Sequence, residues 1–380
     1  MRDPRLNRMA AVIVHYSLEI KPKDLVWMVG EMGALPLMEA IYEQVIRAGG
    51  NIKTDFHPPG WDEIFFRYAN EDQLKHGCPF SLYNATHCDK RIRIIGSTNT
   101  RSLAGVDPIK QALVSQANQV ILKQQLQRSA KGELDWIVSL CPTPAGAQEA
   151  DMGTLDYAHF VYNAAYVDQE DPVSFLKQME KKQQKMIDYL STKKELHFQT
   201  KYGTDLRVNV SGMKWINSCG KRNYPDGEVF TGPNLDAEDG GVNGVIKYTF
   251  PAIWHNTIVE EVELTFTRGV VTRATASKNE TFLRAMLDQD EGAKRLGEIA
   301  IGTNFNIQRF TSNILFDEKI GGTFHAALGM GYPETGNTNQ SALHWDMICD
   351  LKESGGEITA DGEVIMKDGR FIFLGWPGVE

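Results

Sequence analysis

Apolar and polar positions in the first part of the chain alternate in the manner of strands that lead into helices. Residues 24–29 form a short apolar run, which is typical of a buried strand. Residues 35–48 carry apolar side chains at helical spacing, Gly49 and Gly50 end that helix, and residues 51–56 form a second strand-like run. This order of strand, helix and strand predicts two parallel strands joined by a helix.

The same alternation continues through the rest of the first half. Strand-like runs occupy residues 91–95 and 135–140, and long helices are predicted over 107–128 and 172–190. Strands that alternate with helices predict an α/β domain with a mostly parallel sheet. We place this amino-terminal domain at residues 1–193.

Beyond residue 194 the pattern changes to an alternation of apolar and polar side chains with a period of two. Such alternation between short turns predicts antiparallel strands with one buried face. A strand is expected over 258–267, and helices are expected over 279–287 and about 291–299. We therefore predict that residues 194–380 form an α+β carboxy-terminal domain rich in antiparallel strands.

Composition limits the classes of function. The 380 residues are 42% apolar and 23% charged, which is typical of a folded globular protein of about two domains. Forty basic and forty-nine acidic residues give a net charge of −9, which disfavours an extended surface for nucleic acid. No apolar run approaches the ~18 residues of a membrane span. Neither nucleic acid nor a membrane is therefore an expected partner.

The five cysteines are an odd number and include no C-x-x-C pair. A disulfide framework or a thiolate zinc site is therefore not expected. The charged amino terminus is followed by no apolar segment of signal-peptide length. These features favour a cytoplasmic location, where thiols stay reduced.

The turn Gly30–Gly33 after the first strand is rich in glycine and could present backbone N–H groups to a phosphate. It lacks the G-x-G-x-x-G spacing, and it contains Glu31, which would repel a phosphate. An ordinary tight turn is the better interpretation.

Three segments in the second half contain side chains that can bind metal ions. Glu228 follows a turn, His325 and Tyr332 lie in a stretch of small residues, and His344 and Asp346 form an H-x-D pair. Residues two apart on a strand point to the same side, so this pair can reach one cation. Two imidazoles with carboxylates and no thiolate are the ligand chemistry of Zn²⁺, Co²⁺ or Mn²⁺ in hydrolytic sites.

Each of these residues also has a simpler interpretation when taken alone. Glu228 could be a solvated acid in a turn, and His325 could be a core histidine bonded to a carbonyl group. An H-x-D triplet occurs often by chance. The set as a whole favours a hydrolytic site, and more than four donors would suit two adjacent cations.

Longer motifs surround these residues, and they occur in a fixed order: DGEVFTGP at 226–233, LGEIAIGTN at 296–304, NILFDEKIGGTFHAALGMGY at 313–332 and HWDMI at 344–348. Together they resemble the thermophilic aminopeptidase family, the M29-type metalloaminopeptidases. Segments 16–26, 99–108 and 141–152 resemble the amino-terminal half of that family. The resemblance therefore covers nearly the whole chain.

The resemblance implies a set of six metal ligands: Glu228, Glu298, His325, Tyr332, His344 and Asp346. Glu298 enters this set through the resemblance alone. The family further implies two divalent cations (zinc, cobalt or magnesium, with the native metal open), peptide substrates with a free amino terminus, and a homodimer. The segment between Tyr332 and His344 is shorter than in some members, which affects the rim of the substrate pocket more than the metal centre.

A carboxylate is also expected to carry the proton from the attacking water to the leaving amine. Glu318, seven residues before His325, is the candidate general base, with Glu298 and Glu334 as alternatives. The leading hypothesis is a metal-dependent aminopeptidase. A dinuclear dipeptidase or amidase and, more remotely, a silent peptide-binding protein are the alternatives.

Overall fold

The computed structural model describes residues 3–254, 257–372 and 376, and the chain divides into two compact units. The first unit contains Met1–Val173 and Gly220–Pro225, and the second contains Ser174–Cys219 and Asp226–Glu380. The domain boundary expected after residue 193 stays a prediction. Within the described ranges, no helix is long and apolar enough to cross a membrane.

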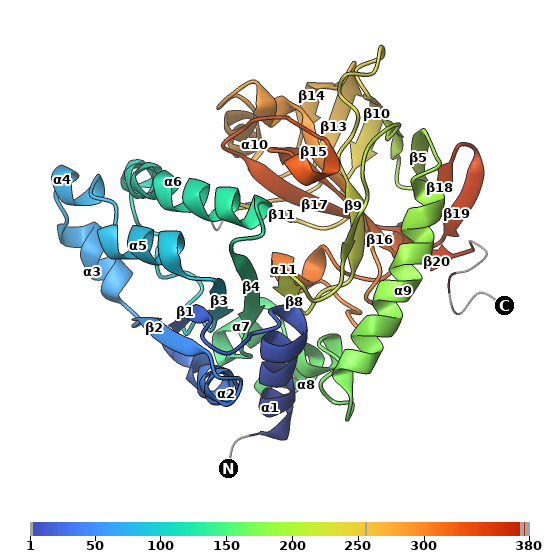
Figure 1. Cartoon of the computed structure of the whole chain (residues 1–380). Coiled ribbons are helices and arrows are strands. Elements are labelled where there is room, and N and C mark those ends of the chain that lie inside the picture. The colour runs from blue at the N-terminus through green and yellow to red at the C-terminus, as the bar shows by residue number, and fades with distance from the viewer. Residues whose placement is uncertain (1–2, 255–256, 373–375, 377–380) are drawn as a thin grey trace. The chain divides into compact units, whose positions relative to one another are not determined.

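The first unit is built on a five-stranded parallel sheet with the strand order β2-β1-β3-β4-β8 (Figure 1). Its strands are β1 (Leu25–Glu31), β2 (Asn51–His57), β3 (Lys90–Ile95), β4 (Asp135–Leu140) and β8 (Asn223–Tyr224). The predicted unit of strand, helix and strand is present as β1, α2 and β2. The α/β architecture expected for the first half of the chain is confirmed.

Helices accompany this sheet, and there are more of them than the two that the sequence predicts over 35–48 and 107–128. They are α1 (Pro4–Ala11), α2 (Leu35–Arg47), α3 (Trp61–Tyr68), α4 (Glu71–Leu74), α5 (Pro79–His87), α6 (Pro108–Ala130), α7 (Pro144–Glu149) and α8 (Thr154–Ala164). The long helix α6 begins where the sequence predicts, because Asp107 caps it by accepting a hydrogen bond from the N–H of Ile109 and Pro108 occupies its first turn.

The second unit contains two larger antiparallel sheets, and the long helix α9 (Pro172–Leu190) leads into it. The eight-stranded sheet has the order β14-β13-β10-β6-β5-β18-β19-β20, with strands Val270–Thr275, Glu263–Thr267, Val242–Lys247, Asp205–Asn209, Glu195–Thr200, Gly356–Ala360, Glu363–Lys367 and Arg370–Phe371. The five-stranded sheet has the order β17-β16-β15-β9-β7, with strands His344–Asp350, Thr323–Gly329, Leu296–Gly302, Glu228–Thr231 and Ile216–Ser218. The antiparallel character predicted for the second half is confirmed.

Smaller elements complete this unit. They are the two-stranded pair β11 (Ala252–Trp254) and β12 (Thr257–Val259) and the helices α10 (Glu280–Leu287), α11 (Ile314–Asp317) and α12 (Leu351–Ser354). The helix predicted at 279–287 corresponds to α10.

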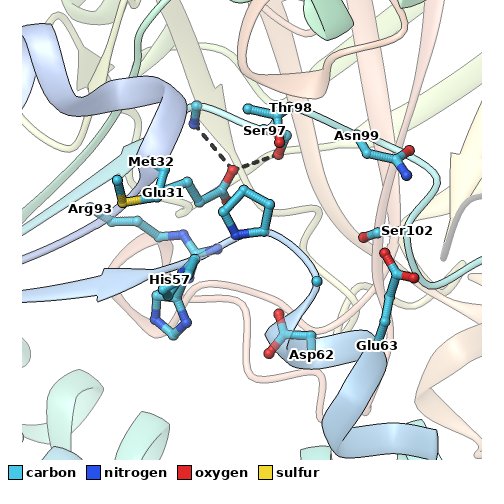
Figure 2. Close-up of a pocket in the computed structure, with 14 residues that line it drawn as sticks. Glu31, Met32, His57, Asp62, Glu63, Arg93, Ser97, Thr98, Asn99 and Ser102 are labelled. Atoms are coloured by element: carbon cyan, nitrogen blue, oxygen red, sulfur yellow. Dashed lines mark hydrogen bonds between the residues drawn. The ribbon is translucent and has the colours of Figure 1, made fainter.

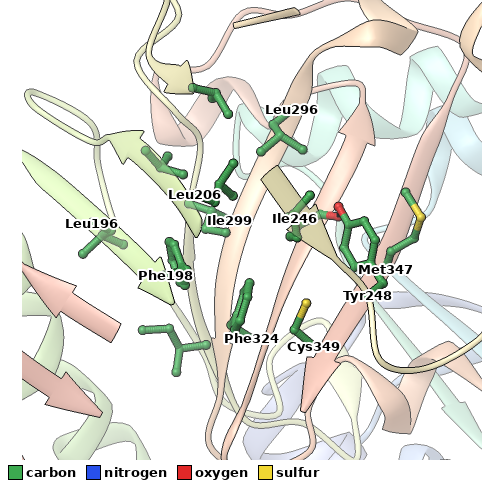
Figure 3. Close-up of a cluster of buried hydrophobic side chains, with 14 of the residues drawn as sticks. Leu196, Phe198, Leu206, Ile246, Tyr248, Leu296, Ile299, Phe324, Met347 and Cys349 are labelled. Carbon is green, nitrogen blue, oxygen red and sulfur yellow. Dashed lines mark hydrogen bonds between the residues drawn. The ribbon is translucent and has the colours of Figure 1, made fainter. Parts of the chain in front are cut away.

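The two larger sheets share one hydrophobic core (Figure 3). Phe198 on β5 and Phe324 on β16 are both fully buried, and their ring centroids lie 4.5 Å apart. The hydroxyl of Tyr248, next to β10, donates a hydrogen bond to the carbonyl of Ala326 on β16 at 3.3 Å. The five-stranded sheet is therefore held in place by packing against the eight-stranded sheet.

The prediction of a helix at about 291–299 is wrong. A single 3₁₀ turn at Gly292–Lys294 leads into strand β15, and all seven residues of that strand are buried. A strand that is covered on both faces carries apolar residues without alternation, and its periodicity then does not distinguish it from a buried helix.

The prediction of one continuous strand over 258–267 is also wrong, because the extended backbone is interrupted. Strand β12 ends at Val259, Glu261 has a φ of +53°, and β13 begins at Glu263. A left-handed residue cannot continue a strand, so the polypeptide turns from the small pair β11 and β12 into the large sheet.

Replacing Phe324 with alanine should lower the free energy of unfolding by about 3–5 kcal/mol, because the substitution leaves a cavity between the two sheets. Chemical denaturation of the metal-free protein, followed by fluorescence, measures this loss. The control is Tyr202→Ala at an exposed turn, which should change stability by less than about 0.5 kcal/mol. Equal losses in the two variants would contradict the inter-sheet core.

Candidate metal centre

The five-stranded sheet of the second unit presents two chemically different faces. Successive residues of a strand point to opposite sides of the sheet. One side carries Val229, Ile299, Phe324, Trp345 and Met347, which all belong to the hydrophobic core. The residues between them point to the other face, and there the sequence places acids and imidazoles.

Four neighbouring strands contribute to this second face. Glu228 begins β9, Glu298 lies on β15, His325 lies on β16, and His344 and Asp346 lie on β17. The expectation that the H-x-D pair lies on an extended segment is confirmed. The antiparallel sheet thereby brings together residues that are up to 118 positions apart, as the register of its strands requires.

Small side chains leave space between these groups. In the register of the sheet, Ala327 pairs with Glu298 on one side and with Asp346 on the other, and Ala300 pairs with His325. A larger residue at either alanine would occupy the space between the donors. The carboxylates and imidazoles can therefore converge above the sheet.

The imidazole of His325 lies at the middle of the cluster. Its Nε2 is 3.4 Å from Glu228 Oε2, 3.3 Å from Glu298 Oε1 and 3.8 Å from Asp346 Oδ1. The Nε2 of His344 is 3.6 Å from Glu298 Oε2 and 3.6 Å from Asp346 Oδ2. Glu298 and Asp346 therefore each direct one oxygen toward each histidine.

The donors form three overlapping groups, and within each group the donor atoms lie within 4.8 Å of one another. The groups are Glu228, Glu298 and His325; Glu298, His344 and Asp346; and Glu318, His325 and Asp346. Five of the six ligands that the sequence predicts, and the candidate base, thus lie in one cluster. The other residue, Tyr332, packs its ring edge-on against His344, with centroids 5.1 Å apart.

The backbone sets the orientation of His344. Its Nδ1–H donates a hydrogen bond to the carbonyl of Met330 at 2.8 Å, which leaves Nε2 as the nitrogen that faces the carboxylates. A carbonyl partner on the distant ring nitrogen is the usual support for a metal-binding histidine.

Sequence reasoning does not identify two groups of the cluster, Lys319 and Asp226. Lys319 is fully buried, and its Nζ lies 2.6 Å from Glu228 Oε1, forms an ion pair with Glu318, and lies 3.8 Å from Asp226 Oδ1. Burial acts to lower the pKa of Lys319, but the charges of Glu228, Glu318 and Asp226 raise it well above its usual value. A lysine among the apolar residues of the 313–332 motif was the only available signal.

Helix α9 supports the start of β9. The side-chain amide of Gln183, which is fully buried, donates to the backbone carbonyls of Glu228 at 2.6 Å and Ser218 at 2.9 Å. These bonds fix the main chain of Glu228 against the neighbouring strand β7, so the position of its carboxylate depends on a helix as well as on the sheet.

The cluster fits a divalent metal. Glu228 Oε2 is buried and accepts no hydrogen bond within the described structure, and an unsatisfied buried acceptor is costly unless a cation meets it. The donors are oxygen and imidazole nitrogen, which suit zinc, cobalt, manganese or magnesium rather than a thiolate-bound structural ion. The observed residues are therefore consistent with a metal ion in this place.

Burial also changes the protonation of the metal-free cluster. Burial raises the pKa of Glu228 to about 8; Lys319 opposes this shift, and the charges of Glu318 and Glu298 add to it. For His325, burial acts to lower the pKa, but the hydrogen bond to Glu298 and the charges of Glu228 and other carboxylates raise it to about 9. Both groups therefore bind protons more readily than their solvent-exposed counterparts when no metal is bound.

A separate cavity of about 570 Å³ lies in the first unit, at the carboxyl ends of β1, β2 and β3 (Figure 2). The carboxylate of Glu31 accepts hydrogen bonds from Ser97 Oγ at 2.6 Å and from the N–H of Gly96 at 3.3 Å. None of the residues that line this cavity belongs to the cluster of carboxylates and imidazoles.

Buried carboxylates and imidazoles without a thiolate define the class of site that metal-dependent hydrolases use. A family model described as thermophilic metalloprotease (M29) matches residues 2–371. The chain belongs to this family and is a metal-dependent peptidase. The family that the sequence motifs indicate is therefore confirmed.

Two aminopeptidases align with nearly the whole chain. Aminopeptidase 2 of Geobacillus stearothermophilus is 25% identical, and the alignment covers 98% of this chain and 98% of the relative. Aminopeptidase T of Thermus thermophilus is 29% identical, with 97% and 98% covered. The solved structure titled wild-type AmpT from Thermus thermophilus matches with a TM-score of 0.85 at 23% identity, covers 97% of this chain and 99% of that chain, and shares its fold.

Metal affinity should rise as the pH increases from about 6 to 9. Glu228, with a pKa of about 8, and His325, with a pKa of about 9, are protonated below these values, so a cation must displace their protons in order to bind. Calorimetric titration of chelator-treated protein with Co²⁺, in buffers of different ionisation enthalpy, measures both affinity and proton release. A constant affinity without proton release would contradict this assignment.

Proposed function

We propose that this protein is an aminopeptidase that removes the amino-terminal residue from peptides with a free α-amine and uses two divalent cations. The observation that carries the proposal is the cluster of carboxylates and imidazoles on the face of the five-stranded sheet opposite the hydrophobic core. The family and the names of its relatives support peptides as substrates. The proposed ligands are the six that the motifs imply: Glu228, Glu298, His325, Tyr332, His344 and Asp346.

The arrangement of the donors supports two cations rather than one. Glu298 and Asp346 each direct one oxygen toward His325 and the other toward His344. A carboxylate with its oxygens divided in this way can be shared between two neighbouring ions.

The charge balance of the cluster also supports two cations. Five carboxylates surround the cluster, and Lys319 contributes one positive charge: Asp226, Glu228, Glu298, Glu318 and Asp346 are the acids. With all five acids ionised and the imidazoles neutral, four negative charges remain. Two divalent cations would neutralise them, whereas one would leave two charges buried without compensation, which is energetically costly.

When bound, the cations would supply an activated water and polarise the scissile carbonyl. The protein supplies the proton carrier, for which we propose Glu318. Its carboxyl lies within the cluster, close to His325 and Asp346, with 13% of the side chain exposed. Burial raises the pKa of Glu318, with Lys319 opposing the shift, and a carboxyl with a raised pKa is suited to accept and return a proton near neutral pH.

The alternative bases have less support. Glu334 is exposed in the 3₁₀ turn Pro333–Thr335 and belongs to none of the three groups. Glu298 has its two oxygens directed at the two histidines, an arrangement that suits a ligand.

Replacing Glu318 with glutamine should lower kcat by about 10²- to 10⁴-fold, the usual contribution of a general acid or base. The variant keeps all six proposed ligands and a side chain of the same size. Glu334→Gln is the matched control and should keep kcat within about twofold of the wild type, because surface changes away from the site are nearly neutral. Steady-state kinetics at saturating metal decides between them, and a large loss in Glu334→Gln alone would reverse the assignment.

An amino-terminal exopeptidase differs from an amidase in its need for a free α-amine. We expect chelator-treated protein to cleave leucine p-nitroanilide after Co²⁺ or Zn²⁺ is restored and to leave the N-acetylated substrate intact. Cleavage of both substrates would favour a dinuclear amidase. If only free dipeptides were cleaved among peptides of increasing length, a dipeptidase would be the better conclusion.

His344→Ala serves as the control for metal dependence in this experiment. The side chain is part of the cluster, and its loss should abolish recovery of activity by added metal while the domain stays folded, because the core face of β17 is unchanged. Full recovery of activity in this variant would remove His344 from the site.

We further propose a cytoplasmic location and a homodimer. No disulfide joins the five cysteines, which all lie in the described residues, and Cys88, Cys141, Cys219 and Cys349 are buried; this supports a reducing compartment. The homodimer rests on the family resemblance, and sedimentation of the purified protein tests it.

A further inference from the structure

Lys319 is an unusual residue within the second unit because its side chain is entirely buried. Lysine is almost never fully buried unless it is paired. Here it lies in the short connection between α11 and β16, directly after Glu318. None of the six proposed ligands requires a lysine beside it.

The backbone around Lys319 is fixed by hydrogen bonds. Its N–H donates to the carbonyl of Phe316 at 2.9 Å, and its carbonyl accepts from the N–H of Asn304 at 3.1 Å. The side-chain amide of Asn304 also donates to the carbonyl of Asp226 at 2.9 Å. The connection that carries Lys319 is therefore tied to the segment that precedes Glu228.

The ammonium group lies between two carboxylates of the cluster. It contacts Oε1 of Glu228 at 2.6 Å and forms an ion pair with Oε1 of Glu318. The second oxygen of Glu228, Oε2, accepts no hydrogen bond and lies 3.4 Å from Nε2 of His325. Lys319 therefore contacts one oxygen of Glu228, and the opposite oxygen faces the donor cluster.

We propose that Lys319 is a positioning residue that holds one oxygen of Glu228 and one oxygen of Glu318, so that Glu228 offers a single oxygen to the metal. The proposal rests on the proposed metal site. The same contact orients Glu318, the proposed proton carrier. Because Lys319 has no exposed surface, it acts through these two carboxylates and does not touch the peptide.

Lys319→Met tests this role by replacing the ammonium with an apolar chain of similar length. Oε1 of Glu228 then becomes free to bind metal, so the coordination number of bound Co²⁺ should increase and its visible absorption should weaken. Loss of an outer partner of a ligand should lower kcat by about 10- to 100-fold. KM should stay within about twofold, because no contact with substrate is lost.

Two control variants separate positioning from general damage. Lys367→Met removes an exposed lysine of the same unit, paired at 3.9 Å with Glu357, and should leave both the Co²⁺ spectrum and kcat unchanged. Glu318→Gln keeps Lys319 beside Glu228, so it should retain the wild-type Co²⁺ spectrum although kcat falls. A Lys319→Met protein with the wild-type spectrum and wild-type kcat overturns the proposal.

A crystal structure of the Co²⁺-loaded wild-type protein gives a second test that does not depend on the folding of any variant. Coordination by Oε2 of Glu228, with Lys319 Nζ retained on Oε1, supports the proposal; coordination through both oxygens of Glu228 overturns it. Wild-type protein that binds Co²⁺ but cleaves no peptide contradicts the proposed function alone, and the spectrum still decides the role of Lys319. Wild-type protein that takes up no Co²⁺ at the cluster contradicts both.

Discussion

The burial of several carboxylates on one face of a sheet is the constraint on which the second unit depends. Each ionised carboxylate loses hydration when it is buried, and neighbouring carboxylates repel one another strongly where water is excluded. Lys319 offsets part of this charge, and burial nevertheless raises the pKa of Glu228. The free energy of metal binding and the electrostatic cost of folding are therefore linked in this unit.

The same strands that carry the donors also form the core. Phe324 and His325 are neighbours on β16, and Trp345 lies between His344 and Asp346 on β17. Since alternate side chains point to opposite faces, packing on one side sets the position of the donors on the other. A site held by packed strands keeps its geometry better than a site on loops. Among the residues named in the site, Asp226, Glu318, Lys319 and Tyr332 come from connections between strands.

The sequence pattern predicted the main features of the fold but not all of its strands. The helical spacing of 35–48 and the apolar runs on either side of it correspond to α2, β1 and β2. Strand β15 overlaps the range in which the sequence pattern predicts a helix, because both of its faces are buried and its apolar residues do not alternate. In the sequence, Glu298 therefore has no recognisable strand context, and only the resemblance to the family indicates that it is a ligand.

The amino-acid sequence indicates which chemistry is available: two histidines and several acids in ordered motifs, no paired thiolates, and a family whose model matches residues 2–371. The pairing of acids with each histidine, and the place of Lys319 among them, become visible in the three-dimensional structure and not in the sequence. The physical reason is that the register of four antiparallel strands, and not spacing along the chain, sets the distances between the donors. Ala300 and Ala327 have no chemistry of their own, yet their small side chains leave the space in which the donors meet.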